Sequence, residues 1–215
     1  MQEVKHRHQC RARRRKDARS ACAATIREEA HALGYKRAMV DQMPAPSALV
    51  RMSPTDVAAL VSLYVRCTDY FLLQDGVTPT LRDARGLFTD LPPGKVAQDQ
   101  AVFGWKEDGF LYAVAAILRD YPTQNIWYLG FMIVDPRWRG RGVGASFYRK
   151  LEAWAVAEGA TELRVAVIED NEPGARFWRA LGFVEARRVG PDRFKTRRHR
   201  RIELRLSVAP ATPDG

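Results

Sequence analysis

The sequence has no apolar run long enough to cross a bilayer, and it has only three cysteines among its 215 residues. A membrane span needs roughly 20 consecutive apolar residues, and the basic N-terminus lacks the apolar segment and cleavage site of a secretory leader. We therefore expect a cytoplasmic protein with no membrane association. Cys10, Cys22 and Cys67 are odd in number and lack metal-ligand spacing, which argues against a disulfide framework and against a metal site.

Positive charge is concentrated at the two ends of the chain. The formal net charge is +10; residues 1–43 hold 11 Lys or Arg against 5 Asp or Glu, and residues 187–205 hold 9 against 2. Basic runs without interleaved aromatic residues are more typical of solvated segments than of nucleic-acid interfaces, so we do not expect nucleic acid as a partner. The sequence predicts a basic extension over residues 1–46, flexible or partly helical, one domain over residues 47–208, and a flexible tail over residues 209–215.

Hydrophobic periodicity and turn residues predict alternating helices and strands within this domain. Ser53-Pro54 is typical of a helix start. The predicted helices cover 54–71, 80–88, 143–159 and 171–182. The predicted strands cover 48–52, 100–105, 110–118, 126–134, 163–168, 184–189 and 201–206, with a basic connection between the last two. Three consecutive strands joined by short turns predict an antiparallel meander, and the whole order indicates an α+β fold around a mixed sheet.

A glycine-rich turn, Arg139-Gly140-Arg141-Gly142-Val143-Gly144, joins the strand at 126–134 to an amphipathic helix. Its glycines allow positive φ, so backbone N–H groups can converge on a phosphate at the positive end of the helix. A Walker A loop is excluded, because Ala145 follows Gly144 where that motif requires Lys and then Ser or Thr. Gly140, Gly142 and Ala145 satisfy the permissive form of the dinucleotide-binding pattern. The antiparallel meander upstream argues against such a site, and so does Glu162, which lies at the beginning of the next strand rather than at its end, where a ribose-binding acid is needed.

A third phosphate-binding family fits more of the chain. Read as Arg-x-x-Gly-x-Gly, the turn resembles the pyrophosphate loop of the GNAT superfamily of N-acetyltransferases. Met132-Ile133-Val134-Asp135-Pro136 looks like the family's fourth strand, and Asn171 followed by Phe177-Trp178 and Leu181-Gly182-Phe183 is similar to its Asn…Leu/Phe-Tyr…Leu-Gly-Phe signature. The resemblance covers roughly residues 48–206. It implies a mostly antiparallel mixed sheet with helices on both faces and a splayed central strand pair.

The resemblance implies an enzyme that transfers an acetyl group from acetyl-CoA, its co-substrate, to an amine acceptor by direct attack in a ternary complex. The fourth strand would contact the pantetheine and acetyl end, with a strand N–H near Ile133 or Val134 as oxyanion donor, and the glycine turn would hold the pyrophosphate. The residues predicted to bind the cofactor are Met132, Ile133, Val134, Arg139, Gly140, Arg141, Gly142, Val143, Gly144, Asn171 and Trp178.

Two departures from the family pattern leave the catalytic residues unassigned. Trp178 stands where the family usually has a tyrosine that protonates the leaving thiolate, and Ala166 stands where some members carry a catalytic glutamate. Glu169, Asp170, Asp120 and Tyr128 lie near strand ends, but such residues are more often surface or capping residues than bases. The departures keep open an alternative function, a non-catalytic acyl-CoA sensor or interaction module with a basic nucleic-acid-binding arm.

The acceptor is left open between a small molecule and a protein amine. In the family it is bound by the first two helices and the connection between the last two strands, here residues 71–91 and 190–200. The second segment is basic, whereas Asp75 and Asp83 in the first are acidic, so the two point to different acceptors. The resemblance also allows a homodimer.

Overall fold

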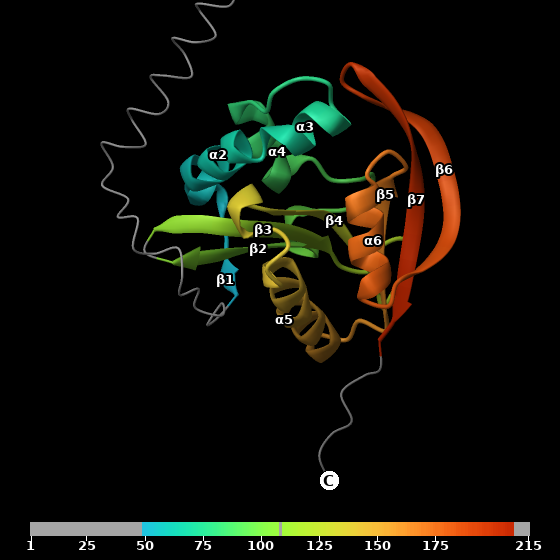
Figure 1. Ribbon diagram of the computed structural model, residues 1–215. Coiled ribbons are helices and arrows are strands. Elements are labelled where there is room, and N and C mark those ends of the chain that lie inside the picture. Colours follow the sequence, from blue (N-terminus) through green and yellow to red (C-terminus); the bar gives the residue numbers. More distant parts are fainter. Residues whose placement is uncertain (1–48, 108, 209–215) are drawn as a thin grey trace, which may run out of the picture. The chain divides into compact units, whose positions relative to one another are not determined.

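The computed structural model describes residues 49–107 and 109–208. Within them, strands form one seven-stranded sheet in the order β1-β2-β3-β4-β5-β7-β6, and helices cover both faces (Figure 1). All neighbouring strands are antiparallel except β4 and β5. The predicted fold class is confirmed. The extension predicted over residues 1–46 and the tail predicted over residues 209–215 lie outside the described residues.

The first half of the sheet is the predicted meander. Its strands are β1 (Val50–Arg51), β2 (Gln100–Glu107), β3 (Phe110–Leu118) and β4 (Ile126–Val134). The turn before β4 uses two residues with positive φ, Asp120 and Asn125, and the Asp120 carboxylate accepts the Asn125 N–H at 2.7 Å. Asp and Asn tolerate this conformation better than other residues with a Cβ, which explains the turn at this point.

Three helices cover one face of the meander: α2 (Val57–Arg66), α3 (Thr68–Gln74) and α4 (Leu81–Thr89). Leu60, Leu63 and Phe71 belong to the core that they form with the sheet. The prediction of one continuous helix to residue 71 was wrong. The chain leaves helical geometry at Cys67, and this break folds Phe71 back until its ring centroid lies 4.7 Å from that of Tyr64. Periodicity did not reveal the break because the apolar spacing continues through it.

The opposite face is covered by α5 (Val143–Ala157) and α6 (Glu172–Ala180) (Figure 1). The ring of Trp154 in α5 packs against Phe103 and Trp127 of the sheet, with centroid distances of 4.6 and 5.3 Å. Between the two helices lies β5 (Glu162–Ile168), which runs parallel to β4. The β4-α5-β5 crossover therefore places the predicted glycine turn at the carboxyl end of β4.

The last two strands form a long hairpin, β6 (Val184–Phe194) and β7 (Arg197–Ser207). The predicted basic connection is therefore wrong in extent, because pairing continues to Phe194 and Arg197. Most of β6 is exposed on both faces, so it lacks the alternating hydrophobicity that marks a strand. Ion pairs hold the tip of this hairpin: Lys195 Nζ lies 3.1 Å from a carboxylate oxygen of Asp75 and 2.7 Å from one of Asp83.

Candidate functional site

The central strands β4 and β5 separate partway along their length. Their pairs run from Ile126 and Glu162 to Leu129 and Val165, after which β4 continues to pair with β3 alone among the described strands. At the point of separation β4 carries a bulge, since Ala116 pairs with Phe131 and Ile117 with Leu129, which leaves Gly130 unmatched. Residues 130–134 thus present toward β5 a backbone edge that no described strand pairs with, which confirms the splayed pair.

The glycine turn lies directly beyond this edge and starts α5. Gly140 and Gly142 have φ of 72° and 81°, a region that favours glycine, and a Cβ built at either one meets no atom within 4 Å. Gly144 differs, because its Cβ would lie 3.2 Å from the Phe177 ring on α6. The first two glycines therefore keep open space at the positive end of a helix, whereas the third permits close helix packing. The first turn of α5 fits a phosphate group.

A buried carboxylate fixes the turn to the rest of the domain. The Asp135 side chain is 1% exposed; it accepts a hydrogen bond from Arg66 Nε at 2.6 Å and from the Arg137 backbone N–H at 3.0 Å. Arg66 also donates to the Leu111 carbonyl at 2.6 Å. Burial alone would raise the pKa of Asp135, but the hydrogen bonds and charge of Arg137, together with Arg66, outweigh it and lower that pKa. The ion pairs tie the approach to the turn to α2 and β3.

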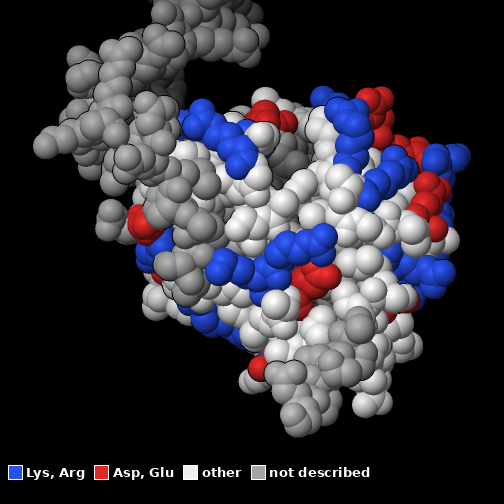
Figure 2. All heavy atoms as spheres, turned by 60° about the horizontal axis from the view of Figure 1, so that its bottom comes forward, with Lys and Arg blue, Asp and Glu red and all other residues white. Residues whose placement is uncertain are grey.

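The two arginines of the turn have protein partners in this structure. The Arg139 guanidinium donates to the Val134 carbonyl at 2.9 Å and forms an ion pair with Asp69 in the first turn of α3. The Arg141 guanidinium lies 5.5 Å from the centre of the Trp138 ring. The face seen in Figure 2 has a band of Lys and Arg side chains across its middle, with acidic side chains beside it. The cofactor contacts of Arg139 and Arg141 stay predictions.

The two predicted residues on and before α6 have clear structural partners. The Asn171 side chain caps the helix by accepting the Gly174 N–H at 3.0 Å. Trp178 is 9% exposed, and its ring packs against those of Tyr148 and Phe183, at centroid distances of 5.4 and 5.3 Å. Trp178 thus contributes to an aromatic cluster between α5 and α6. Contact of Asn171 and Trp178 with a cofactor stays a prediction.

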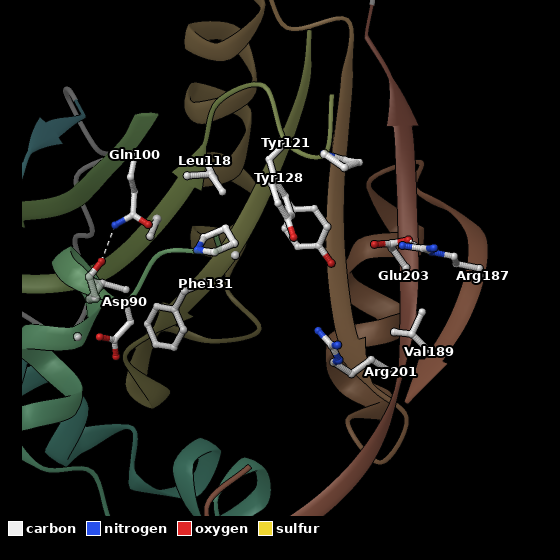
Figure 3. A pocket seen from close by; sticks show the side chains of 16 residues that line it. Asp90, Gln100, Leu118, Tyr121, Tyr128, Phe131, Arg187, Val189, Arg201 and Glu203 are labelled. Carbon is white, nitrogen blue, oxygen red and sulfur yellow. Dashed lines mark hydrogen bonds and ion pairs between the residues drawn. The ribbon is translucent and has the colours of Figure 1, made fainter. Parts of the chain in front are cut away.

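A cavity of about 490 Å³ opens beside the β4 bulge (Figure 3). Tyr121 and Tyr128 lie at its centre, with ring centroids 5.8 Å apart, and Gly130 forms part of its wall. Asp90 and Phe131 lie on one side and Arg187 and Glu203 on the other (Figure 3). Its remaining lining residues are Gly86, Leu87, Pro92, Gln100, Ala116, Leu118, Pro122, Val189 and Arg201.

Glu203 on β7 is the residue of this cavity that sequence reasoning missed. It is 6% exposed and forms an ion pair with Arg187 on β6. Burial raises the pKa of Tyr128 to about 12, and the negative charge of the nearby Glu203 carboxylate contributes to the rise. In the sequence Glu203 stands between Ile202 and Leu204, both of them buried. Alternation with Ile202 and Leu204 puts Glu203 at an ordinary polar position of the strand, so no sequence pattern indicated that it is buried; what it faces depends on strand pairing.

The other candidate acids and bases have different surroundings. Tyr128 lines the cavity, whereas Glu169 pairs with Arg188 at 2.9 Å and Asp170 lies 3.2 Å from His199 Nδ1. Asp120 holds the turn before β4, as described above. Asp75 and Asp83, the acidic residues of the predicted acceptor segment, both pair with Lys195. Among the four predicted candidates, Tyr128 is therefore the one that lines this cavity.

Neither a membrane span nor a metal centre is found in the part of the chain that the structure describes. None of its helices is both long enough and apolar enough to cross a membrane. No three His, Cys, Asp or Glu side chains within that part are grouped as metal ligands would be.

Comparison with proteins of known sequence gives partial matches. The thialysine N-epsilon-acetyltransferase of Bos taurus is 34% identical over 55 residues, covering 26% of this chain and 32% of that protein. The Sus scrofa protein of the same name is 27% identical over 92 residues, covering 43% of this chain and 50% of that protein. The chain therefore spans half or less of the length of these relatives.

Solved structures match over more of their length. An acetyltransferase from Thermus thermophilus has a TM-score of 0.63 at 21% identity, covering 74% of this chain and 96% of that chain. The ribosomal-protein-S18-alanine N-acetyltransferase of Escherichia coli has a TM-score of 0.57 at 18% identity, covering 78% and 99%. At these identities the likeness shows the fold alone. A family model described as the acetyltransferase (GNAT) family matches residues 74–183, half of the sequence. This chain belongs to the acetyltransferase (GNAT) family.

Proposed function

We propose that the protein transfers an acetyl group from acetyl-CoA to an amine acceptor by direct attack. The observation that carries this proposal is the free edge of β4 leading into the glycine turn at the start of α5. Coenzyme A combines a pyrophosphate with an amide-bearing arm, so it needs an anion cradle next to unpaired backbone. Both features lie in sequence order along residues 130–144.

The proposed binding mode uses mainly backbone atoms. The N–H groups of Gly140 to Gly144 would hold the pyrophosphate. The pantetheine amides would pair with Met132 to Val134 in the manner of an added strand. A strand N–H near Ile133 or Val134 would then polarise the acetyl carbonyl. For Arg139 to reach a phosphate, its guanidinium would have to leave Asp69.

The amine acceptor would enter through the cavity beside the bulge, where Gly130 lines the wall. Tyr121, Tyr128 and Phe131 offer aromatic surface, on which an alkyl ammonium group can rest through cation–π attraction. The relatives named above act on thialysine or on the alanine of a ribosomal protein, as their names state. This chain's acceptor is proposed only as an amine, of a small molecule or a protein, encountered in the cytoplasm.

A non-catalytic acyl-CoA sensor is the second candidate function. It is supported by Trp178, whose ring is packed in the aromatic cluster and whose indole N–H is not a practical acid. It is also supported by Ala166, which has no acid–base chemistry. Under this alternative the protein would bind acetyl-CoA and transfer nothing.

Calorimetric titration of acetyl-CoA into the full chain, followed by a thiol-release assay, tests both candidates. The amines are n-butylamine, thialysine and a tetrapeptide that begins with alanine. Binding together with amine-dependent thiol release is expected under the proposed function. Binding without release on any amine would favour the sensor, and the absence of binding would contradict both.

A further inference from the structure

The position that holds a catalytic glutamate in some family members has a carboxylate on the adjacent strand. Ala166 on β5 pairs directly with Glu203 on β7. Side chains of directly paired residues project from the same face of a sheet. Glu203 therefore presents its carboxylate on the face where Ala166 presents only a methyl group, and this carboxylate lines the cavity.

The two residues lie level with the point where the central strands separate. Pairing of β4 with β5 ends at Leu129 and Val165, one residue before Gly130 and Ala166. Adjacent strands are about 4.8 Å apart, so the backbones of Gly130 and Glu203 are separated by about 10 Å or more. Glu203 and Gly130 both line the cavity of about 490 Å³, which is large enough to hold an amine.

Charged and titratable groups surround this carboxylate from each neighbouring element. Arg187 on β6 forms the ion pair with it, and Tyr128 on β4 lines the same cavity, near enough for the carboxylate charge to contribute to the raised pKa of Tyr128. Arg201 lies two residues away on β7, but its guanidinium is held 2.5 Å from Asp192. Tyr121 lies beside Tyr128, and β5 contributes the uncharged Ala166. The Arg187 side chain is 63% exposed, so the ion pair is open to solvent on one side and can rearrange.

We propose that Glu203 is the base that accepts a proton from the acceptor ammonium group in the cavity. This inference rests on the proposed acetyl transfer. The ammonium N–H gives its proton to a Glu203 carboxylate oxygen, and the neutral amine attacks the thioester carbonyl carbon. The N–C bond forms, the C–S bond breaks, and the departing thiolate takes a second proton from the amine nitrogen. Glu203 then releases its proton to solvent, which restores the carboxylate.

The first test replaces the carboxylate by an amide of the same shape, Glu203→Gln. The matched control is Glu185→Gln, which removes a carboxylate from β6, where Glu185 pairs with Leu204 and contacts Arg179 of α6 on the other face. We expect kcat of Glu203→Gln at neutral pH to fall about 10²–10³-fold, the range of general base catalysis. The affinity for acetyl-CoA should stay close to that of the unmodified protein, and the control should keep its kcat. The thermal midpoint of Glu203→Gln should fall, because Arg187 loses its charged partner, so kcat is measured well below that midpoint.

The pH profile separates a base from a merely structural residue. With thialysine as the probe, the deficit of Glu203→Gln should shrink as the pH approaches about 10, where a lysine-like amine loses its proton unaided. In Glu203→Ala, added formate should restore part of the rate, because it can occupy the space of the lost carboxylate. The same salt should have no effect on Glu185→Ala.

Two results would overturn the assignment. One is a kcat of Glu203→Gln within about threefold of the unmodified protein at neutral pH, since a base contributes far more. The other is a deficit that is equal at every pH and is not relieved by formate. A different result would contradict the proposed acetyl transfer itself: the unmodified protein would release no thiol with any of the three amines. In that case there would be no reaction for which Glu203 could act as a base.

Discussion

Replacing Gly142 by glutamate tests whether the glycine turn holds a phosphate. Gly142 has a φ of 81° and open space around its missing Cβ, so a side chain there meets no packing clash. The left-handed conformation costs an L-residue about 1–2 kcal/mol. For a domain of this size, that cost lowers the melting temperature by about 2–8 °C. We therefore expect Gly142→Glu to fold.

The effect on acetyl-CoA binding should exceed this cost in stability. A carboxylate about 5 Å from a phosphate charge is repelled by about 0.8 kcal/mol in bulk water and by about 3 kcal/mol at a surface dielectric constant near 20. Two phosphate charges double these values, to about 2–6 kcal/mol. The dissociation constant for acetyl-CoA should therefore rise at least about tenfold. Gly142→Lys introduces similar bulk with the opposite charge and should bind more tightly than Gly142→Glu.

Gly159 provides the matched control at the other end of α5. It has a φ of 101° and the same open surroundings, so Gly159→Glu introduces the same residue with similar backbone strain. The two glycines are about 25 Å apart along the helix, well beyond the screening length of about 8 Å in physiological salt. Gly159→Glu should lower the melting temperature without changing acetyl-CoA affinity.

Isothermal titration of acetyl-CoA and thermal unfolding followed by circular dichroism measure the two quantities separately. An unchanged dissociation constant in Gly142→Glu would refute the assignment of the turn to the pyrophosphate. Equal weakening in Gly142→Glu and Gly159→Glu would show that the loss reflects destabilisation of α5 rather than a local phosphate contact.

Two further predictions concern the surroundings of the turn. Trp178→Ala empties the aromatic cluster between α5 and α6 and should lower the free energy of unfolding by about 3–5 kcal/mol, measured by urea denaturation; a loss under about 1 kcal/mol would contradict its packing role. Asp135→Asn should cost about 2–4 kcal/mol at neutral pH because Arg66 and Arg137 lose their charged partner. Since folding lowers the pKa of Asp135, its stabilisation is present above the unfolded value of about 3.9 and is lost as the pH falls through the folded value. The difference between Asp135→Asn and the unmodified protein should therefore shrink below about pH 4, and a constant difference would contradict this account.

Local sequence patterns predicted most of the strands and helices that surround the proposed cofactor site. Apolar runs bounded by short turns marked β3 and β4 at their observed bounds, and the glycines marked the start of α5. These features depend on neighbouring residues, whose spacing directly sets the backbone geometry. The hairpin β6–β7 was underestimated because its exposed strands lack that alternation.

The sequence alone determined the proposed cofactor site: a strand, a glycine turn and a helix that follow one another and need no distant partner to be recognised. Tertiary structure decided the proposed acceptor site. Only strand pairing places Glu203 opposite Ala166, brings Arg187 to it from β6, and opens the cavity beside Gly130. Register between strands far apart in the chain is set by packing of the whole sheet, so spacing in the sequence cannot specify it.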